Sequence, residues 1–466
     1  MRVLFAVLLL AAGPVRAQTA SAQTAPAPPD ARPRNVVFMI ADGFGPASEV
    51  LARAANGRPL ALDGILTGAV STPSTDSRVT DSAAGATAYA CGIKSYNGAI
   101  AVGPDGAPCR TVLEAARDAG FATGLVATSR ITHATPASYA AHVPQRADEA
   151  EIAAQMAAAR LDVMIGGGGR FFVPESAGGS RTDGRDLRRE MLAHGALVTT
   201  SRAGLDRFPA APAVALLAPD HMAYEIDRDE TDEPALAAMA TKALDLLAAT
   251  PAAHAHGFFL MVEGSRIDHA GHGNDAAAHV RDILAYDAAV AAVLDWARRD
   301  GNTLVVSTAD HETGGLTLGR DGIYAYDPAA LMAATMSAER LSVRLAEPGA
   351  DGVALVREGL GLAPGDSLWA PDDLQLRMGG VVDYAATFRD IADRRAGVAW
   401  TTSGHTGVDV GLYAFGPGAD LFRGAMTNDA VGRATFAALG LPLPPEAQAA
   451  EVRAAADAAD AAAVAP

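Results

Sequence analysis

The sequence predicts an α/β protein with a doubly wound, mostly parallel central sheet flanked by helices, and with an inserted cap- or crown-like subdomain. The first observation is a set of short apolar runs, bounded by Gly or Asp, in which polar and apolar residues do not alternate. Strands that are buried on both faces have this pattern. The second observation is that helical patterns lie between these runs, which is typical of a parallel sheet covered by helices. The runs span 35–45, 124–129, 161–169, 258–264, 302–311 and 410–418.

The helical patterns follow the strands in chain order. They occupy 111–120, 149–160, 233–250 and 279–301, and the last of them ends at Gly301, which is a helix stop signal. Two stretches fit the alternation poorly. One is the Gly-, Pro- and Arg-rich segment 170–233, and the other is an irregular run that we interpret as the inserted subdomain, at 321–398.

The N-terminus predicts an exported protein. In residues 1–17, Arg2 precedes the apolar segment Val3–Ala12, and small residues follow, with Ala17 or Ala20 as cleavage sites. This is the pattern of a secretory signal peptide, and the apolar segment is too short to span a bilayer. A retained membrane anchor is the alternative. We therefore expect a periplasmic or extracellular protein with a Pro/Ala-rich linker at 18–34, a folded domain at 35–445 and an Ala-rich tail at 446–466.

The composition argues against nucleic acid as a partner, and it leaves open whether the two cysteines form a disulfide. The formal net charge is −17 and no basic stripe is evident, which argues against a nucleic-acid-binding module. No segment after the signal is long and apolar enough to predict a transmembrane helix. Cys91 and Cys109 are compatible with a disulfide in an oxidising compartment, or with Cys91 as a buried thiol in a helix.

Ionisable residues gather where several predicted strands end. In "MVEGSRIDHAGH", residues 261–272, an apolar run leads directly into carboxylates and imidazoles. Buried carboxylates are costly unless a cation pairs with them, and one arginine, Arg266, cannot neutralise them all. This end of the strand is therefore either a solvated loop or a metal site. The full group comprises Asp42, Glu263, Asp268, His272, Asp310, His311 and His405.

The residue types in this group favour metals. Asp268 and His272 are four residues apart, so one helical turn places them on the same face. Aspartate and neutral histidine are zinc ligands, and seven such groups exceed the needs of one tetrahedral zinc, so we expect two or three metals. Taken singly, each residue has an ordinary interpretation: a strand-end aspartate as a cap or turn residue, and His405 as a solvated side chain.

Ser82 is a candidate nucleophile in "TDSAAGATAY". It begins a helix rich in small residues, which leaves room for a tetrahedral substrate near the helix N-terminus, where backbone N–H groups favour anions. The alternative is an ordinary helix N-cap. There is no G-x-S-x-G elbow around Ser82, so a metal, not a histidine base, would have to remove its proton.

A third stretch, 127–146, supplies residues for an anion. His133 and Thr135 are two apart and would face one side of an extended segment. Arg146 ends an apolar helical stretch and is either a phosphate clamp or a surface arginine. The histidines that lie in no such context are His194, His221, His254 and His256, and we assign them no role.

Taken in order, "ADGFG", "TDSAAGATAY", "THATPASYAAH", "VEGSRIDHAGH", "STADHETGG" and "SGHTG" resemble the motifs of the alkaline phosphatase family. The resemblance covers most of 35–146, 258–316 and 400–440 and is thin elsewhere. It implies a catalytic domain at 35–445 that holds two zinc ions and one magnesium ion, a phosphoserine intermediate and phosphate monoesters as substrates. It also makes a homodimer possible.

The resemblance also sorts the residues into roles. Ser82 matches the nucleophile and Arg146 the phosphate-binding arginine. The remaining matches are Asp268, His272 and His405 for the first zinc, Asp42, Asp310 and His311 for the second, and Asp42, Thr135 and Glu263 for magnesium.

Near the site, His133 and His269 fall at positions that vary among branches of the family, and both are histidine here as in animal-type members. A phosphodiesterase of the same superfamily is the alternative function. A sulfatase is disfavoured because neither cysteine lies in a Cys-x-Pro-x-Arg motif.

Overall fold

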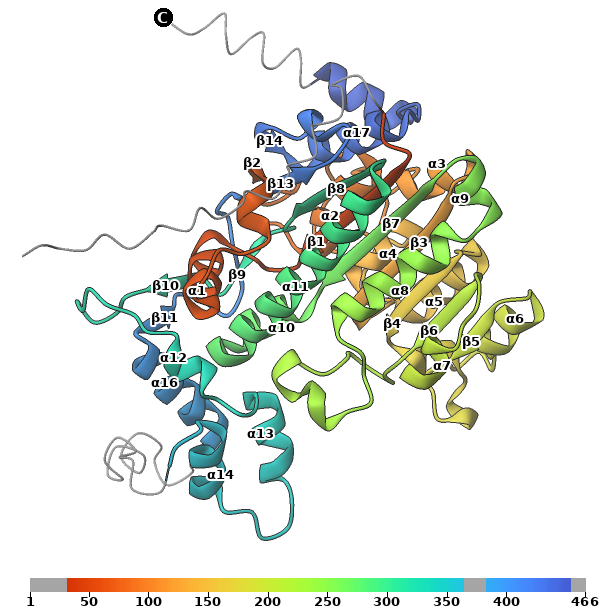
Figure 1. Cartoon of the computed structure of the whole chain (residues 1–466). Helices are drawn as coiled ribbons and strands as arrows, with labels where there is room; N and C mark the ends of the chain where they lie inside the picture. The colour runs from red at the N-terminus through yellow and green to blue at the C-terminus, as the bar shows by residue number, and fades with distance from the viewer. Residues whose placement is uncertain (1–31, 364–382, 454–466) are drawn as a thin grey trace, which may run out of the picture.

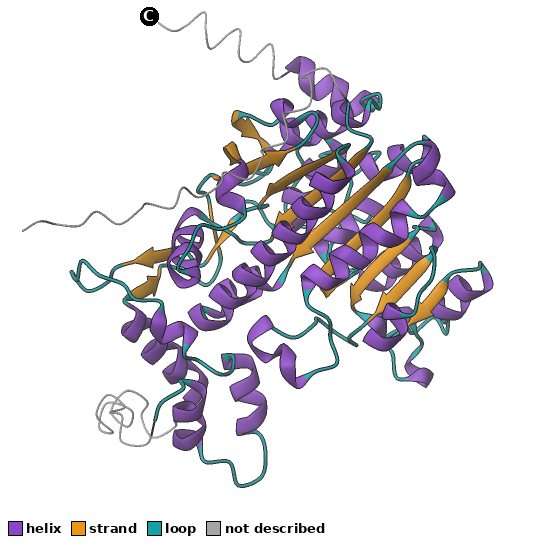
Figure 2. Cartoon of the chain, viewed as in Figure 1, coloured by secondary structure: helices purple, strands orange, loops and turns teal. Residues whose placement is uncertain are grey.

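The computed structural model describes residues 32–363 and 383–453 (Figure 1). A sheet runs through the middle of the molecule with helices on both faces (Figure 2). All its strand pairs are parallel except those of β13, so the predicted doubly wound α/β class is confirmed. In spatial order the ten strands are β14 (Gly424–Thr427), β2 (Leu66–Ser71), β13 (Val410–Phe415), β8 (Thr303–Thr308), β1 (Asn35–Ala41), β7 (Phe258–Gly264), β3 (Ala122–Arg130), β4 (Val163–Gly167), β6 (Ala213–Leu216) and β5 (Leu197–Thr199).

The centre of the sheet explains the non-alternating runs. Every residue of β1, β7 and β8 is buried, because helices cover both faces of these strands. In the parallel register, Val37 of β1 lies opposite Leu260 of β7 and Val305 of β8. The six apolar runs are therefore strands, as predicted.

The helices form two layers. α8 and α11 pack on each other and contact β3, β7 and β8, whereas α2, α3, α4 and α17 form a connected layer that contacts β1, β3 and β7. Helix α11 ends at Gly301 in the left-handed conformation, at φ 74°, as the sequence predicts. Between residues 32 and 318 the α-helices are α1 (Pro46–Asn56), α2 (Ser82–Cys91), α3 (Val112–Asp118), α4 (Ala134–Ala140), α5 (Glu149–Ala159), α6 (Leu187–Ala193), α7 (Arg202–Asp206), α8 (Leu236–Ala248), α9 (Pro251–Ala255), α10 (Arg266–Gly273) and α11 (Ala276–Asp300), and α17 (Asn428–Leu439) follows the last strand of the sheet.

The sheet extends beyond the predicted strands at both edges. The segment 170–233, which fits the alternation poorly in the sequence, contributes β5, β6, α6 and α7. At the other edge, β2 and β14 were not predicted. β2 ("LTGAVS") has a glycine and few large apolar residues, and most of β14 is exposed, so neither has the pattern of a buried strand.

A group of helices lies beyond the central sheet, at the lower left of Figure 1. It connects the two strands of a small antiparallel sheet, β10 (Leu316–Leu318) and β11 (Val398–Trp400). We call its described members the β10–β11 helices; they are α12 (Ala329–Met332), α13 (Ala338–Leu345), α14 (Gly352–Gly359) and α16 (Tyr384–Ala396). They pack around Leu341, Val356 and Phe388 in a hydrophobic cluster separate from the main core.

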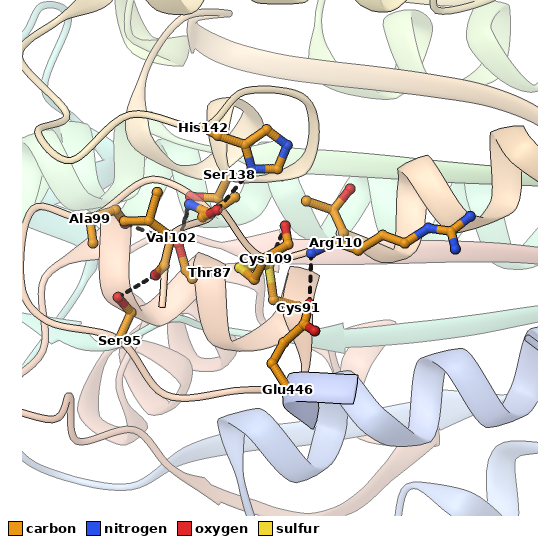
Figure 3. Close-up of a disulfide and its surroundings, with 12 residues drawn as sticks. Thr87, Cys91, Ser95, Ala99, Val102, Cys109, Arg110, Ser138, His142 and Glu446 are labelled. Atoms are coloured by element: carbon orange, nitrogen blue, oxygen red, sulfur yellow. Dashed lines mark hydrogen bonds between the residues drawn. A yellow bond between two sulfur atoms is a disulfide. The ribbon is translucent and has the colours of Figure 1, made fainter. Parts of the chain in front are cut away.

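Cys91, the last residue of α2, forms a disulfide with Cys109 (Figure 3), and their Cα atoms are 6.0 Å apart. The alternative of a buried thiol is therefore wrong. The neighbouring Arg110 N–H donates to Glu446 Oε1 at 3.0 Å, which connects this loop to the C-terminal segment. The predicted signal at 1–17 lies outside the described residues. Within the described part of the chain, no helix combines the length and apolarity needed to cross a membrane.

Candidate active site

Four neighbouring strands, β8, β1, β7 and β3, bring most of the predicted site residues to one edge of the sheet. Asp42 follows β1 directly, Glu263 is the penultimate residue of β7, and Asp310 comes two residues after β8. His133 and Thr135 follow β3. Because these strands are parallel, their carboxyl ends meet at the same edge, where α/β proteins bind their ligands.

The first group of ligand atoms comes from Asp268, His272 and His405. α10 places Asp268 and His272 one turn apart, as predicted, with Oδ1 and Nε2 3.4 Å apart. His405 Nε2 lies 3.1 Å from His272 Nε2 and 3.7 Å from Asp268 Oδ1. Both rings use Nδ1 to bond a carbonyl, of Ser403 at 2.6 Å and of Thr80 at 2.8 Å, so in the neutral rings Nε2 carries the lone pair. Ligands of a tetrahedral zinc with bonds of about 2.0 Å are separated by about 3.3 Å, which this triangle matches.

The second group surrounds His311 Nε2. Ser82 Oγ lies 3.1 Å from this atom, Asp310 Oδ2 3.4 Å and Asp42 Oδ1 3.6 Å. All four side chains are buried. Burial lowers the pKa of His311 well below its usual value, so the ring is neutral and can act as a ligand. The two groups are adjacent, because the His311 and His405 rings stack with centroids 3.5 Å apart.

One hydroxyl connects the two groups. Thr313 Oγ1 donates to Asp268 Oδ1 at 2.6 Å and lies 3.2 Å from His311 Nδ1. Since its single proton goes to the carboxylate, Thr313 accepts from Nδ1–H of the ring, which leaves His311 Nε2 unprotonated. Sequence reasoning did not identify Thr313, because a threonine beside a ligand motif gives no chemical signal of its own.

The carboxylates here lack the positive charge that they need. Burial, followed by repulsion from Asp310, raises the pKa of Asp42 well above its usual range. Burial raises the pKa of Asp310 to about 8 and that of Glu263 to about 7. Buried polar atoms are nearly always partnered, so orphaned carboxylate oxygens in this cluster fit metal ligation. Among the described residues, the buried unpartnered atoms at this site are Asp42 Oδ1 and Oδ2, Glu263 Oε1, Asp310 Oδ2, Thr135 Oγ1 and His133 Nδ1.

A third possible ligand group shares Asp42 with the second. Ligand atoms of Asp42, His133 and Glu263 all lie within 4.8 Å of one another. His133 is the N-cap residue of α4, and Thr135 lies in the first turn of that helix. The predicted extended conformation of this pair is therefore wrong. His133 still contributes a ligand atom to this group, and the Thr135 hydroxyl is buried without a partner among the described residues.

Ser82 is the first residue of α2 and is not its cap. Asp81 is the N-cap, and its Oδ1 accepts from the backbone N–H of Ala84 at 3.0 Å. This excludes the N-cap interpretation of Ser82. The Ser82 hydroxyl is buried and faces the second group of ligand atoms, at the N-terminus of a ten-residue helix where backbone N–H groups favour an anion.

Arg146 contacts Asp81, the residue before Ser82, and is half-buried. Its NH1 donates to Asp81 Oδ2 at 3.0 Å, and its NH2 donates to His133 Nε2 at 3.0 Å. α4 ends at Ala140, so Arg146 stands in a loop and does not end a helix. A guanidinium held from two sides is preorganised to bind two oxygens of a phosphoryl group.

His221, to which the sequence assigns no role, belongs to this neighbourhood. Its ring centroid lies 5.4 Å from that of His133 and 4.3 Å from that of His269. A signal did exist: "VALLAPDH" is an apolar run that ends in Asp-His, just as β8 leads to Asp310 and His311. The structure does not bring His194, His254 and His256 to the site.

The fold and the site define a class of protein: a doubly wound α/β protein whose strand ends carry groups of metal-ligand side chains around a buried serine hydroxyl. The model of the alkaline phosphatase family matches residues 33–441. A repressible alkaline phosphatase of Saccharomyces cerevisiae is 40% identical over 435 residues, which cover 82% of this chain and 76% of the yeast protein.

Solved structures agree with this match. A cold-active alkaline phosphatase from Shewanella sp. is 35% identical with a TM-score of 0.78, and covers 87% of this chain and 99% of its own. The alkaline phosphatase of the Antarctic bacterium TAB5 is 28% identical with a TM-score of 0.66, over 88% of this chain and 99% of its own. The chain therefore belongs to the alkaline phosphatase family and is an enzyme.

Proposed function

We propose that this enzyme is exported and hydrolyses phosphate monoesters through a phosphoserine formed on Ser82. The observation that carries the proposal is the position of the Ser82 hydroxyl. It is buried, 3.1 Å from His311 Nε2, in a cluster where several carboxylate oxygens have no hydrogen-bond partner among the described residues. Arg146 donates to Asp81, the residue before Ser82, and to His133 of the third ligand group, where it can hold the phosphoryl oxygens.

The residues fit two zinc ions and one magnesium ion. The imidazoles of the two zinc groups present Nε2 to their group, which suits zinc, and the oxygen-rich group suits magnesium. A solved structure of the TAB5 enzyme, a histidine-to-aspartate mutant, has Mg bound in its M3 site, which supports magnesium in the family. In our assignment the first zinc takes Asp268, His272 and His405; the second takes Asp42, Asp310, His311 and Ser82; magnesium takes Asp42, Thr135 and Glu263, with His133 and His269 nearby.

When bound, these metals would lower the pKa of the hydroxyl and of water and stabilise a leaving alkoxide. The residues of the chain orient the substrate and accept the phosphoryl group. Arg146 and the N-terminus of α2 orient the phosphate monoester. Ser82 Oγ, having lost its proton, forms a bond to phosphorus as the bond to the leaving oxygen breaks, and the alkoxide takes up a proton. Water then attacks the phosphoserine, which releases inorganic phosphate and restores the Ser82 hydroxyl.

The test is steady-state hydrolysis by the mature protein, loaded with zinc and magnesium, at alkaline pH. We would compare p-nitrophenyl phosphate with bis-p-nitrophenyl phosphate. A monoester preference of several orders of magnitude is expected, because Arg146 and the third metal group recognise a dianionic phosphoryl group. A preference for the diester would overturn the proposal and assign the protein to the phosphodiesterases.

Export and assembly belong to the same proposal. The signal pattern at 1–17 supports export to the periplasm or the medium, and a homodimer is expected from the family. N-terminal sequencing of the secreted protein tests the first, with cleavage expected after Ala17 or Ala20. Sedimentation of the mature protein tests the second.

A further inference from the structure

Arg266 does not neutralise the carboxylates of the site, although it lies in the same motif. It is 4% exposed, and its guanidinium stacks on Tyr224, 3.7 Å from the ring centroid. Its NH2 donates to both carboxylate oxygens of Glu339, at 3.0 and 2.8 Å, and its NH1 bonds to His269 Nδ1 at 3.0 Å. Arg266 therefore faces a histidine beside the site on one side and an acid of α13 on the other.

His269, which contacts one side of Arg266, is connected through His133 to Arg146, the proposed phosphate-binding arginine. Because an arginine can only donate, His269 Nδ1 must accept, so His269 is neutral with its proton on Nε2. The His269 ring packs edge-on against that of His133, with centroids 5.3 Å apart. His133 Nε2 in turn accepts from Arg146 NH2 at 3.0 Å. The orientation of Arg146 thus depends on two rings, and Arg266 holds the outer one.

Glu339, which contacts the other side of Arg266, belongs to the β10–β11 helices. Glu339 is on the first turn of α13, and its side chain is 61% exposed, so the pair is buried at the arginine end and open at the glutamate end. Separate contacts attach the same helix to the body of the protein. Ser337 bonds to Asp227, the backbone N–H of Ala338 donates to Asp275, and Arg340 pairs with Glu230. Removing Glu339 would therefore leave α13 attached.

A buried guanidinium needs a carboxylate partner, and Glu339 is the one that contacts it in the described chain. Without Glu339, the charge of Arg266 would be left beside His269, His133 and His221, and the guanidinium would reorient toward other acids. The hydrogen bond to His269 Nδ1 would then be lost. The Arg266–Glu339 pair is therefore placed to control the orientation of the His269 ring, which packs against His133, the partner of Arg146.

We propose that Arg266 and Glu339 are positioning residues for phosphate binding: Glu339 of α13 holds Arg266, Arg266 fixes the orientation and tautomer of His269, and His269 supports the His133–Arg146 contact. The β10–β11 helices thereby contribute to the phosphate site without touching it. This inference rests on the proposed function, since it assigns the affected step to Arg146.

The kinetic test compares Arg266→Met, Glu339→Ala, the double variant and Glu230→Ala, all loaded with zinc and magnesium. Glu230→Ala is the matched control, because it breaks another ion pair of α13 that does not reach the site. Arg266→Met and Glu339→Ala should each raise KM and the inhibition constant of inorganic phosphate at least about threefold, with a smaller change in kcat, while Glu230→Ala leaves both unchanged. The double variant should be no worse than Arg266→Met, because Glu339 acts through Arg266.

A spectroscopic measurement of the His269 tautomer tests the proposal independently of activity. Long-range ¹H–¹⁵N correlation of histidine-labelled protein, with the His269 signals assigned from His269→Gln, should show an Nε2–H tautomer that Arg266→Met and Glu339→Ala abolish. An unchanged tautomer in these variants would overturn the proposal. So would equal kinetic effects of Glu339→Ala and Glu230→Ala, or additive effects in the double variant. If the wild-type protein fails to hydrolyse monoesters, the proposed function fails, but the tautomer still tests the contact.

Discussion

The Nε2 atoms of His272 and His405 face each other at 3.1 Å. Each ring commits its Nδ1 to a backbone carbonyl, so two lone pairs point at the same space and repel unless a cation lies between them. Asp268 Oδ1 completes this arrangement at 3.4 and 3.7 Å from the two nitrogens. The backbone thus prepares a ligand triangle, and second partners of this kind are what fix the tautomer of metal-binding histidines.

Metal removal should therefore destabilise the protein. Treatment with a chelator should lower the unfolding midpoint by at least about 5 °C relative to the zinc- and magnesium-loaded protein, because binding to the folded state alone stabilises it. Differential scanning calorimetry measures the shift, and reloading should reverse it. His272→Ala should weaken zinc binding at least about tenfold in a chelator competition, whereas His194→Ala, at an exposed position away from the site, should not. Equal midpoints with and without metal would contradict the assignment.

Ser82→Ala should lower kcat at least about a hundredfold, because the variant lacks the oxygen that forms the bond to phosphorus. Ser138→Ala is the control: Ser138 is also buried and lies against α2, but its hydroxyl donates to the carbonyl of Ala134 at 2.8 Å and does not face the cluster. Steady-state assays with p-nitrophenyl phosphate give the rates. Mass spectrometry of quenched wild-type enzyme should find phosphate on the peptide that contains Ser82. Near-wild-type turnover of Ser82→Ala would remove the nucleophile role.

Much of this site could be predicted from the sequence, because the alternation of strands and helices determines which chain segments meet. Asp42, Glu263 and Asp310 follow separate apolar runs, and a parallel sheet brings the carboxyl ends of such runs together. The four-residue spacing of Asp268 and His272 likewise becomes a shared helix face. These relations depend only on local pattern and on general topology.

The parts that could not be predicted depend on side-chain direction between distant elements. Thr313 connects the two ligand groups through one hydroxyl, which no spacing rule reveals. Arg266 turns from the carboxylates toward Glu339, 73 residues away, in a stretch where sequence patterns are irregular. The sequence also placed Ser82 as a possible cap, whereas Asp81 takes that role and frees the Ser82 hydroxyl.

Arg146→Ala should weaken inhibition by inorganic phosphate at least about tenfold, since a guanidinium held by Asp81 and His133 gives charge-assisted hydrogen bonds to phosphate oxygens. Zinc content should not change, because Arg146 donates to no residue of the two proposed zinc groups in the described structure. Inhibition constants and elemental analysis measure the two quantities. Arg170→Ala, which removes a more exposed arginine paired with Asp220, is the control. Equal phosphate inhibition in Arg146→Ala and wild type would exclude Arg146 from the site.

The pair of His142 and Glu114 should make stability depend on pH. Burial alone would lower the pKa of His142, but the hydrogen bond from Nε2 to Glu114 Oε1 at 3.0 Å and that from Nδ1 to the carbonyl of Ala101 raise it above 6.5. A group whose pKa is raised by folding contributes stability that is fully present below its unfolded pKa, and loses it as the pH rises through the folded value. The contribution of His142 should therefore fall as the pH rises above 6.5.

This dependence is measured as the difference in thermal midpoint between wild type and His142→Gln, with zinc and magnesium present at every pH so that metal effects cancel. The difference should be largest near pH 6 and should shrink toward pH 8, because protonated His142 loses its charge over that range. His254→Gln, at an exposed histidine, should show a constant difference near zero. Folding lowers the pKa of Glu114: burial opposes this, but the bond from His142 outweighs it. The difference in thermal midpoint should therefore also shrink on acidification below about pH 4.5, because Glu114 then becomes protonated. A difference that stays constant from pH 6 to 8 would show that the neutral hydrogen bond, and not the charge of His142, supplies the stability.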